Sequence, residues 1–502
     1  MIDYLKKRPM LLCGICASAL CVIAFYSRTA VFFLGLALIF LFFFLILNRV
    51  NYVYAFVVFM LVMVSVSVLV TFNRIDTVNK LDATKVNGSF VAIESPVNHG
   101  SYYSAVIKAC DCERLESGTR IMVFGGDGGF ECGDKIVGTV NISKVSGKYR
   151  ASDYSEKIYL TGYIDNVTVY SGEGSFVLSN VNRLRNYIVD ALFSNMDYEE
   201  AVTLTALTVG DRLYLSDDFY GNVKAAGVSH VMVVSGMHLA IIVSLALRLT
   251  DKILYNRYLK AITVLLTVLF MSVLCGFTKS IVRAGLCYIL YAVSIVLKRD
   301  NTPENTLGAA VSLILIAEPF TIFSISFQLS VLSTLGITAI AIPITDYLNQ
   351  KHSKVGIIML FISPIVVTLS ALIFTLPITV WIFGYISRVT VASNILITYA
   401  VSPALYFAAV GLVLFPVIPI LGHIFLLASS FVVKYINLVI NGLGSLPFSV
   451  MRLGRYSFLF ALLLLVSVLF ALFACKRRQD MLKLKIMHEK IISEGGGKLI
   501  WR

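Results

Sequence analysis

Charged side chains are scarce in this sequence. Asp, Glu, Lys and Arg make up 14% of its 502 residues and hydrophobic residues make up 58%, whereas soluble globular domains average about 25% and about 45–50%. Between residues 10 and 72 the only charged residues are Arg28 and Arg49. A soluble protein of this size could not bury so much apolar surface. The composition therefore excludes a soluble class and indicates a polytopic α-helical membrane protein.

Two short motifs are also missing. The apolar run 10–26 follows a basic N-terminus, as in a signal peptide, but a second apolar run begins at once instead of a small-residue cleavage site. No Gly-x4-Gly-Lys-Ser/Thr motif is present, so the chain is not expected to carry its own ATP-driven motor. The glycine-rich turn 125–129 lacks the helix of a phosphate-binding loop, and we interpret it as a hairpin loop.

The apolar runs predict about 12 transmembrane helices, since each run approaches the ~20 residues that a spanning helix needs. Lys6, Lys7 and Arg8 favour a cytoplasmic N-terminus, and an even number of crossings returns the basic tail 476–502 to the same side. With this topology, five basic residues lie on the outer side of the membrane, so either some segments are re-entrant or these side chains have a function. They are Lys279, Arg283, Arg388, Arg452 and Arg455. The predicted spans are 10–26, 30–47, 53–72, 229–249, 261–276, 283–298, 306–318, 321–343, 355–383, 391–415, 419–441 and 456–475.

Residues 73–180 differ in composition from the apolar blocks on either side. They carry 11 Lys and Arg and 13 Asp and Glu, and three crossings place them outside the cytosol. Short alternating or β-branched runs at 89–93, 102–109, 120–124, 135–140 and 157–164 predict a small, all-β, OB-like barrel. Cys110, Cys112 and Cys132 fall in this insert, and an oxidising compartment favours one disulfide from Cys132 to either of the other two.

The chain therefore divides into five predicted parts. Transmembrane helices occupy 1–72, and the extracytoplasmic barrel occupies 73–180. Residues 181–227 are predicted to form amphipathic helices at the membrane interface, because they are too short or too polar to span. Residues 228–475 form a second membrane domain, and 476–502 a basic cytoplasmic tail.

One polar stretch departs from ordinary membrane-helix composition. Gly210-Asp211-Arg212 precedes Ala225-Ala226-Gly227-Val228-Ser229-His230, which runs on to Ser235-Gly236-Met237-His238. Ionisable residues at membrane depth are costly and mark functional sites. Two glycines interrupt the helix, which predicts a broken, water-accessible segment of the kind found where backbone lines a cavity.

These motifs resemble the ComEC-type competence proteins, the membrane channels for DNA uptake. The likeness covers about residues 30–475 and continues through Arg283, Phe327-Gln328-Leu329-Ser330, Leu335-Gly336, Leu376-Pro377, Phe383-Gly384 and Asn394. Upstream, Asp153-Tyr154 and Tyr159-Leu160 resemble the end of the family's OB-like domain. The resemblance implies a DNA receptor protein and a cytosolic helicase-like ATPase as partners. Full-length members usually add a nuclease domain with a His-x-His-x-Asp-His motif, which is absent here, so a separately encoded nuclease is a further expected partner.

Each candidate residue also has a simpler structural interpretation. Asp211 and Arg212 are a surface ion pair or a constrained pair near the channel mouth, and Lys279 and Arg283 are interfacial side chains or phosphate contacts. Ser235 and His238 have the spacing of a nucleophile and base, but no third orienting group is visible. Ser326, Ser330 and Thr334 form a stripe that is typical of helix packing. The candidates for the DNA path are Asp211, Arg212, Ser229, His230, Ser235, Gly236, His238, Lys279, Arg283 and Gln328.

The sequence thus predicts a channel for single-stranded DNA in the cytoplasmic membrane, without a nuclease, metal or cofactor of its own. A membrane enzyme acting on lipid or peptide through Asp211, His230 and His238 is the alternative from another class. A family member that does not transport is a third possibility, because the nuclease motif is missing.

Overall fold

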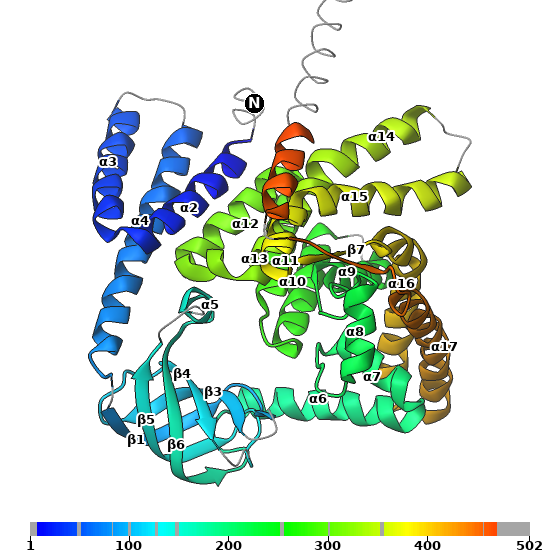
Figure 1. Cartoon of the computed structure of the whole chain (residues 1–502), viewed down its shortest axis with the longest axis horizontal. Helices are drawn as coiled ribbons and strands as arrows, with labels where there is room; N and C mark the ends of the chain where they lie inside the picture. Colours follow the sequence, from blue (N-terminus) through cyan, green and yellow to red (C-terminus); the bar gives the residue numbers. More distant parts are fainter. Residues whose placement is uncertain are drawn as a thin grey trace, which may run out of the picture.

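The computed structural model of the protein (Figure 1) describes residues 8–47, 52–82, 84–98, 102–125, 129–145, 150–251, 256–299, 302–351, 356–454 and 456–468. The basic tail 476–502, Lys6, Lys7 and most of the predicted hairpin loop 125–129 lie outside the described residues. Within them, a bundle of helices carries a β domain at one end and a long helix, α6, across its base.

Three apolar helices begin the chain: α2 (Pro9–Tyr26), α3 (Arg28–Leu47) and α4 (Tyr52–Asn79). The last of these runs past the predicted boundary at residue 72 and leads directly into the β domain. Helix α2 packs closely on α12 (Pro303–Ala317), where Gly14 and Gly308 let the two backbones touch. An ion pair of 3.2 Å between Arg8 and Glu304 lies at the same interface. The N-terminal helices are therefore an integral part of the membrane bundle.

The β domain is a closed five-stranded barrel. Its strands are β1 (Thr84–Ala92), β3 (Tyr103–Cys112), β4 (Arg120–Gly125), β5 (Lys135–Lys144) and β6 (Ile158–Tyr170), with β2 (Val97–Asn98) extending the edge of β3 and the short helix α5 (Arg150–Ser155) before β6. The order around the barrel is β1-β3-β4-β6-β5-β1, and only the β4–β6 pair is parallel. Alternate side chains such as Ile121 and Val123 fill the interior. All five predicted strands are confirmed.

The predicted disulfide is not formed in this structure, and the barrel holds Cys112 and Cys132 at different places. Cys112 donates a hydrogen bond from its Sγ to the Ser89 carbonyl oxygen, whereas Cys132 donates to the carbonyl oxygen of Ile93. These two carbonyls lie at different points along β1 and the turn that follows it, and a disulfide requires Cα atoms within about 7 Å. Cys110, Cys112 and Cys132 are all free.

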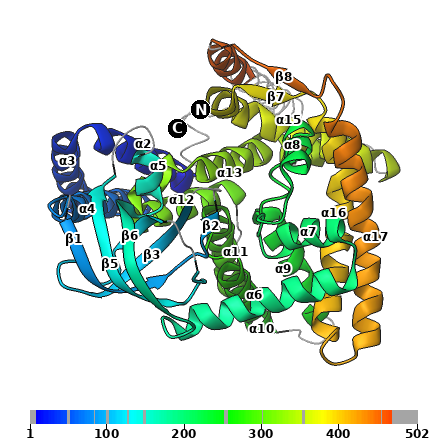
Figure 2. The same cartoon turned by 60° about the horizontal axis from the view of Figure 1, so that its bottom comes forward.

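Of the helices predicted to lie at the membrane interface, α7 is the one that the structure places in the protein interior. Helix α6 (Phe176–Asn195) crosses the base of the molecule from the barrel to α16 (Thr390–Leu414) and α17 (Pro419–Gly444), as Figures 1 and 2 show from two directions. Helix α7 (Tyr198–Thr208) is buried all round from Glu200 to Leu207, so it belongs to the protein interior rather than to the membrane surface. Helix α8 (Asp217–Ala225) starts at the capping residue Ser216, whose Oγ accepts from Phe219 N.

The second membrane domain contains the remaining helices. Eight helices among the described residues are long and apolar enough to cross a membrane, and four shorter apolar helices accompany them. The predicted span 321–343 is divided between a 3-10 turn, a helix and a π-helical turn, and the helix predicted to start at 229 begins only at Gly236. The elements are α9 (Gly236–Asp251), α10 (Arg257–Leu274), α11 (Lys279–Leu297), α12, η1 (Pro319–Phe323), α13 (Ile325–Gly336), η2 (Ile337–Ala341), α14 (Ile342–Lys351), α15 (Gly356–Phe383), β7 (Tyr385–Ser387), α16 (Thr390–Leu414), α17 (Pro419–Gly444) and β8 (Val450–Arg452), followed by an apolar helix at Ser457–Val468.

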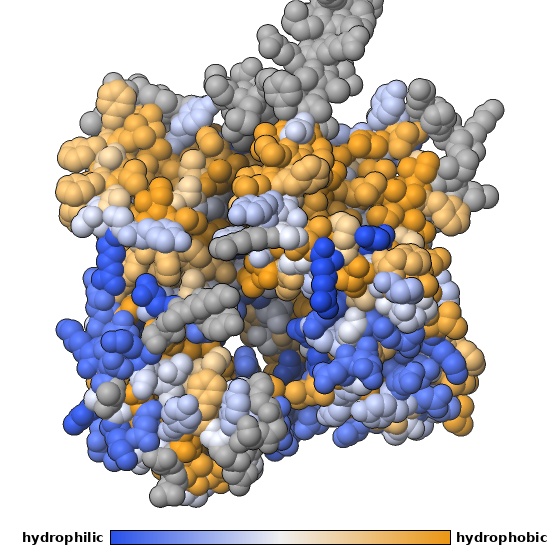
Figure 3. All heavy atoms as spheres, in the orientation of Figure 1, coloured by the Kyte–Doolittle hydropathy of each residue, from blue (hydrophilic) through white to orange (hydrophobic). Residues whose placement is uncertain are grey.

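The surface divides into an apolar and a polar part. Figure 3 shows hydrophobic side chains over the upper half of the molecule, where α2–α4 and α12–α15 lie, and hydrophilic side chains over much of the barrel. The described chain begins at α2 and ends after Ser457–Val468, and both of these lie at the apolar end, away from the barrel. This division is that of a membrane protein with one large polar domain outside the bilayer.

Candidate functional site

The helix break predicted from the two glycines is confirmed. Residues 226–235 form turns between α8 and α9, and Gly227 has a φ of 74°, in the left-handed region. A Cβ at Gly227 would overlap Thr390 Oγ1, so the segment packs closely against the start of α16. Val228, Val231, Met232 and Val234 are buried along it. Irregular backbone of this kind is tolerated at membrane depth only inside protein or beside water.

The Ser-Gly-x-His motif forms the start of α9. Ser235 Oγ accepts from Met237 N at 3.3 Å, and His238 Nδ1 accepts from Ser235 N at 3.2 Å. This is the reciprocal pattern of a capping box, with histidine in place of the usual Glu or Gln. Because a backbone N–H can only donate, Nδ1 is unprotonated and the proton lies on Nε2. Among the described residues this buried Nε2 has no hydrogen-bond partner.

The same cap explains the distance between Ser235 and His238. Their side chains lie 3.1 Å apart, as a nucleophile and base would. However, Ser235 Oγ already accepts a backbone hydrogen bond at the helix end, and within the described part of the chain no side chain orients His238 through Nε2. The geometry is thus accounted for by helix capping, and it offers no specific support for the alternative of a hydrolytic enzyme.

Arg283 on α11 is the charged residue of a polar cluster that also contains Ser280, Ser330 and the start of α9 at Gly236. Only 7% of Arg283 is exposed, and its Nε donates to Ser330 Oγ on α13 at 2.8 Å. Ser280, one turn earlier on α11, lies 3.3 Å from the same oxygen. A Cβ at Gly236 would lie 3.2 Å from Arg283 Nη2, so the glycine lets the start of α9 approach the guanidinium. Three segments far apart in the sequence, from α9, α11 and α13, thus meet at Arg283.

Among the described residues no carboxylate pairs with Arg283. Its Nε donates to Ser330 Oγ, and its Nη2 lies beside Gly236. An unpaired charge inside a protein costs several kcal/mol or more. Since five N–H groups of a guanidinium match the oxygens of phosphate and carboxylate, such a group is a natural contact for an anionic ligand.

His230 extends the polar region along the broken segment. The residue is exposed in this structure. His230 is also within electrostatic reach of His238, which relates the broken segment to the capped end of α9.

Cysteine replacements along 229–235 should distinguish wet from dry positions. In a background without the native cysteines, we expect His230→Cys to react readily with membrane-impermeant thiol reagents, because His230 is exposed and a broken segment beside the DNA path should be wet. Met232→Cys, at a site with 0% exposure, is the matched control and should stay unmodified. No modification at either position, in a protein that is still active, would refute this prediction.

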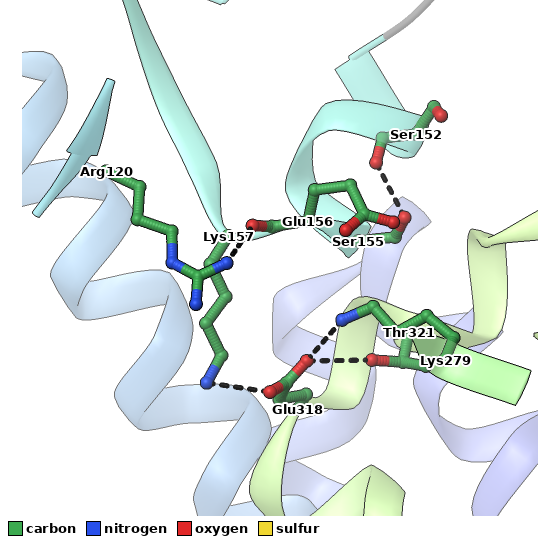
Figure 4. Close-up of polar contacts among 8 residues, drawn as sticks. All are labelled: Arg120, Ser152, Ser155, Glu156, Lys157, Lys279, Glu318 and Thr321. Atoms are coloured by element: carbon green, nitrogen blue, oxygen red, sulfur yellow. Dashed lines mark hydrogen bonds and ion pairs between the residues drawn. The ribbon is translucent and has the colours of Figure 1, made fainter. Parts of the chain in front are cut away.

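Lys279 does not join Arg283, although the two lie one turn apart on α11. Its Nζ lies 2.6 Å from Glu318 Oε2, and Lys157 from the barrel reaches Glu318 Oε1 at 2.8 Å (Figure 4). Thr321 also donates to Oε2. In this structure Lys279 takes part in an ion pair that joins the barrel to the membrane bundle, which neither interpretation from sequence included.

The ion pairs of Glu318 with Lys157 and Lys279 form a joint between the barrel and the bundle, and electrostatics keep its groups charged. Burial alone would raise the pKa of the Glu318 carboxyl, but the ammonium groups of Lys279 and Lys157 lower it to about 2, from an ordinary value of 4.5. Because the folded-state pKa is the lower one, the pairs stabilise the joint fully above pH 4.5 and weaken as the pH falls toward 2. The joint is therefore fully formed at physiological pH.

Aromatic rings reinforce the joint. Phe320 on η1 packs against Tyr154 of α5 with ring centroids 5.9 Å apart and against Phe72 of α4 at 5.2 Å. Lys157 adopts a left-handed backbone with φ of 61°, which is unfavourable for a non-glycine residue and places its side chain toward Glu318. The barrel is thus fixed to the bundle on the α4 side.

The other candidates have local roles. Asp211 Oδ1 accepts from Leu213 N at 2.9 Å in a turn of its own, and Arg212 is exposed, so no ion pair between the two is present. Gln328 donates to the Ile322 carbonyl oxygen at 2.7 Å and fixes the η1–α13 loop. Ser229 is half-buried beside His230. Sequence reasoning missed Glu318 entirely, and it assigned Ser330 to helix packing, although the four-residue spacing of Ser326, Ser330 and Thr334 was the available signal.

The fold and this cluster define a polytopic membrane protein with an inserted β barrel and a polar centre inside its helix bundle. The chain matches the family described as "Competence protein" over residues 207–478, more than half of its length, and it belongs to that family. It is similar to ComE operon protein 3 of Bacillus subtilis (strain 168), with 22% identity over 413 residues. That match covers 80% of this chain and 50% of the relative, so the chain spans about half the relative's length. No solved structure matches it.

Proposed function

We propose that this protein conducts single-stranded DNA across the cytoplasmic membrane during DNA uptake in competence. The observation that carries the proposal is Arg283, a buried guanidinium without a carboxylate partner among the described residues, in a competence-family membrane domain. A DNA strand carries one negative charge per phosphate, so its path through the bilayer needs positive and polar groups and water. Arg283, Ser280 and Ser330 supply positive charge and polar groups, and the broken segment at His230, which is exposed, would meet the water.

The topology and surface of the barrel are evidence for a nucleic-acid substrate. Its strand order and its single parallel pair are those expected for an OB-like barrel, and OB folds bind oligonucleotides on the face of their second and third strands. The corresponding strands here are β3 and β4. Tyr102, Phe124 and Tyr163 form a row on and beside that face, with centroids 6.1 Å and 5.8 Å apart. Tyr163 is 65% exposed, which suits a platform for base stacking rather than a core residue.

We predict that removing these rings weakens DNA binding. Replacing Tyr163 or Phe124 by Ala should cost about 1–3 kcal/mol of binding free energy for a single-stranded oligonucleotide, the usual value of one base–aromatic stack. Tyr170 is the control, since it is also exposed on β6 but does not pack against the row. Binding to the full protein in detergent is the measurement, and an unchanged affinity in the Tyr163 and Phe124 variants would argue against this face.

The proposal places the barrel outside the cytosol and both termini in it, as the basic N-terminus and the crossing count favour. A DNA receptor protein would deliver the strand, a cytosolic helicase-like ATPase would pull it, and a nuclease would come from another domain or chain. The direct test is uptake of labelled DNA by cells that lack this protein, with and without the chain restored. Uptake that is equal in both cases would refute the proposed function.

A further inference from the structure

An opening passes through the molecule beneath the membrane bundle. Figure 3 shows it at the centre of that view, and Figure 1, in the same orientation, places it between the barrel, α6 and the ends of α10 and α11. Helix α6 runs along the lower side of the opening and contacts both the barrel and α10. Asn182 Nδ2 donates to Glu131 Oε2 of the barrel at 2.8 Å, and Arg185 Nε donates to the Leu274 carbonyl oxygen at the end of α10 at 2.7 Å.

Charged side chains of the barrel and of α6 lie within electrostatic reach of one another. Glu94, directly after β1, interacts electrostatically with Arg120 of β4 and with Arg185 of α6. Glu94 is exposed. Burial raises the pKa of the Glu94 carboxyl, Glu156 raises it further, and the two guanidinium groups oppose this.

The two arginines retain most of their donors. Arg185 uses Nε for Leu274, and Arg120 uses Nη1 for the Glu156 carbonyl oxygen at 3.4 Å. Within the described residues neither forms an ion pair with a carboxylate. Their remaining N–H groups present the planar fork that phosphate oxygens accept in pairs.

We propose that this opening is the entrance by which a single-stranded polynucleotide leaves the barrel and enters the membrane bundle, with Arg120 and Arg185 as its phosphate contacts. The inference rests on the proposed function and names the place where the substrate enters. Arg120 and Phe124 lie on the same face of β4, because alternate residues of a strand share a face. A polynucleotide bound on the exposed rings and following β4 would therefore reach Arg120 and then Arg185 on α6.

A nucleic acid fits this arrangement better than a phospholipid headgroup does. The row of rings at Tyr102, Phe124 and Tyr163 suits stacked bases, and an arginine at the end of the row suits the phosphates between them. The opening also lies on the polar side of the molecule, next to the barrel and away from the apolar surface of α2–α4.

The native Cys132 provides a probe at the opening. Its thiol is half-buried and within electrostatic reach of both Arg185 and Glu94. In a full-length variant that keeps only this cysteine, we expect a short oligodeoxythymidylate to slow maleimide labelling of Cys132. A cysteine placed at the exposed Glu173 of the β6–α6 turn is the control, and its labelling rate should not change.

The salt dependence of binding separates a phosphate contact from a structural role. Each of Arg120→Gln and Arg185→Gln should lower the slope of log affinity against log salt by about 0.7, the value for one phosphate contact with a single strand. Arg114→Gln and Arg183→Gln remove exposed arginines that do not interact with Glu94, and their slopes should match that of the unmodified protein.

Three results would overturn the proposed entrance. If the oligonucleotide binds but leaves Cys132 labelling and the salt slopes unchanged, the proposed function stands and the entrance lies elsewhere. If anionic phospholipid vesicles protect Cys132 and the oligonucleotide does not, the arginines hold lipid headgroups. If the oligonucleotide does not bind and the protein restores no uptake, the proposed function fails as well.

Discussion

Arg283→Gln should lower DNA uptake roughly ten- to hundredfold at unchanged protein level, since a hydrogen bond to a charged group is worth about 1.5–3 kcal/mol. Arg283→Lys should keep part of the activity, because it preserves the charge but loses the planar fork. Glutamine can still donate to Ser330, which Arg283 now contacts at 2.8 Å. The loss would therefore report the missing charge rather than a missing packing contact.

The stability of the Arg283→Gln variant is the second measurement. Removing a buried charge that has no counter-ion in the described part of the chain should leave the thermal unfolding temperature of Arg283→Gln unchanged or higher, since the desolvation cost disappears. Arg299, exposed after α11, is the matched control, and Arg299→Gln should affect neither uptake nor stability. Normal uptake by Arg283→Gln would show that the guanidinium does not contact the strand. A lower unfolding temperature would show that its role is structural.

Gly308→Val should destabilise the protein by about 3 kcal/mol or more, at the upper end for overpacking. A Cβ at Gly308 would overlap the Met10 carbonyl oxygen and Leu11 Cα of α2, and backbone cannot move aside as a flexible side chain can. Helix α2 would have to separate from α12, which would also disturb the nearby contact between Ser312 and Cys13. Close packing through small residues is what joins helices in lipid, where the hydrophobic effect between them is absent.

Gly442→Val is the control for this experiment. Gly442 also lies inside a helix, α17, but a Cβ there meets nothing within 4 Å. The intrinsic cost of valine in a helix is common to both variants and cancels in the comparison. Unfolding of both proteins in lipid or detergent is the measurement. Similar stability of the two variants would mean that α2 and α12 do not depend on their close approach.

Local patterns were sufficient for the elements of this fold. Every predicted strand of the barrel is present, since alternation and turn residues act over a few positions. The break at 226–235 was also predictable, because Gly227 and Gly236 change the backbone directly. One local prediction differs from the structure, because the second helix of the predicted interfacial layer, α7, is buried. Helix α7 is apolar enough to be buried, and its burial is decided by α17 and α6 packing around it, which no short window contains.

The disulfide and Lys279 were decided by long-range placement. Cys110, Cys112 and Cys132 are close in sequence, but the register of β1 with β3 carries Cys112 away from Cys132. Lys279 has the right spacing to act with Arg283, yet it pairs with Glu318 at the end of α12 and with the barrel through it. In each case the partner lies on another element, so side-chain spacing alone could not identify it.

The sequence by itself determined the class of this protein, a polytopic membrane protein with a polar β insert, because composition and apolar runs act through solvation, which depends on no partner. It also determined that Ser235, Gly236, His238 and Arg283 are special, because each is unusual in an apolar setting. Only the tertiary structure decided that these residues meet across α9, α11 and α13, that Arg283 has no counter-ion among the described residues, and that Arg120 and Arg185 both lie within electrostatic reach of Glu94. The physical reason is that charge pairing and desolvation depend on distance in space, which the order of residues along the chain does not contain.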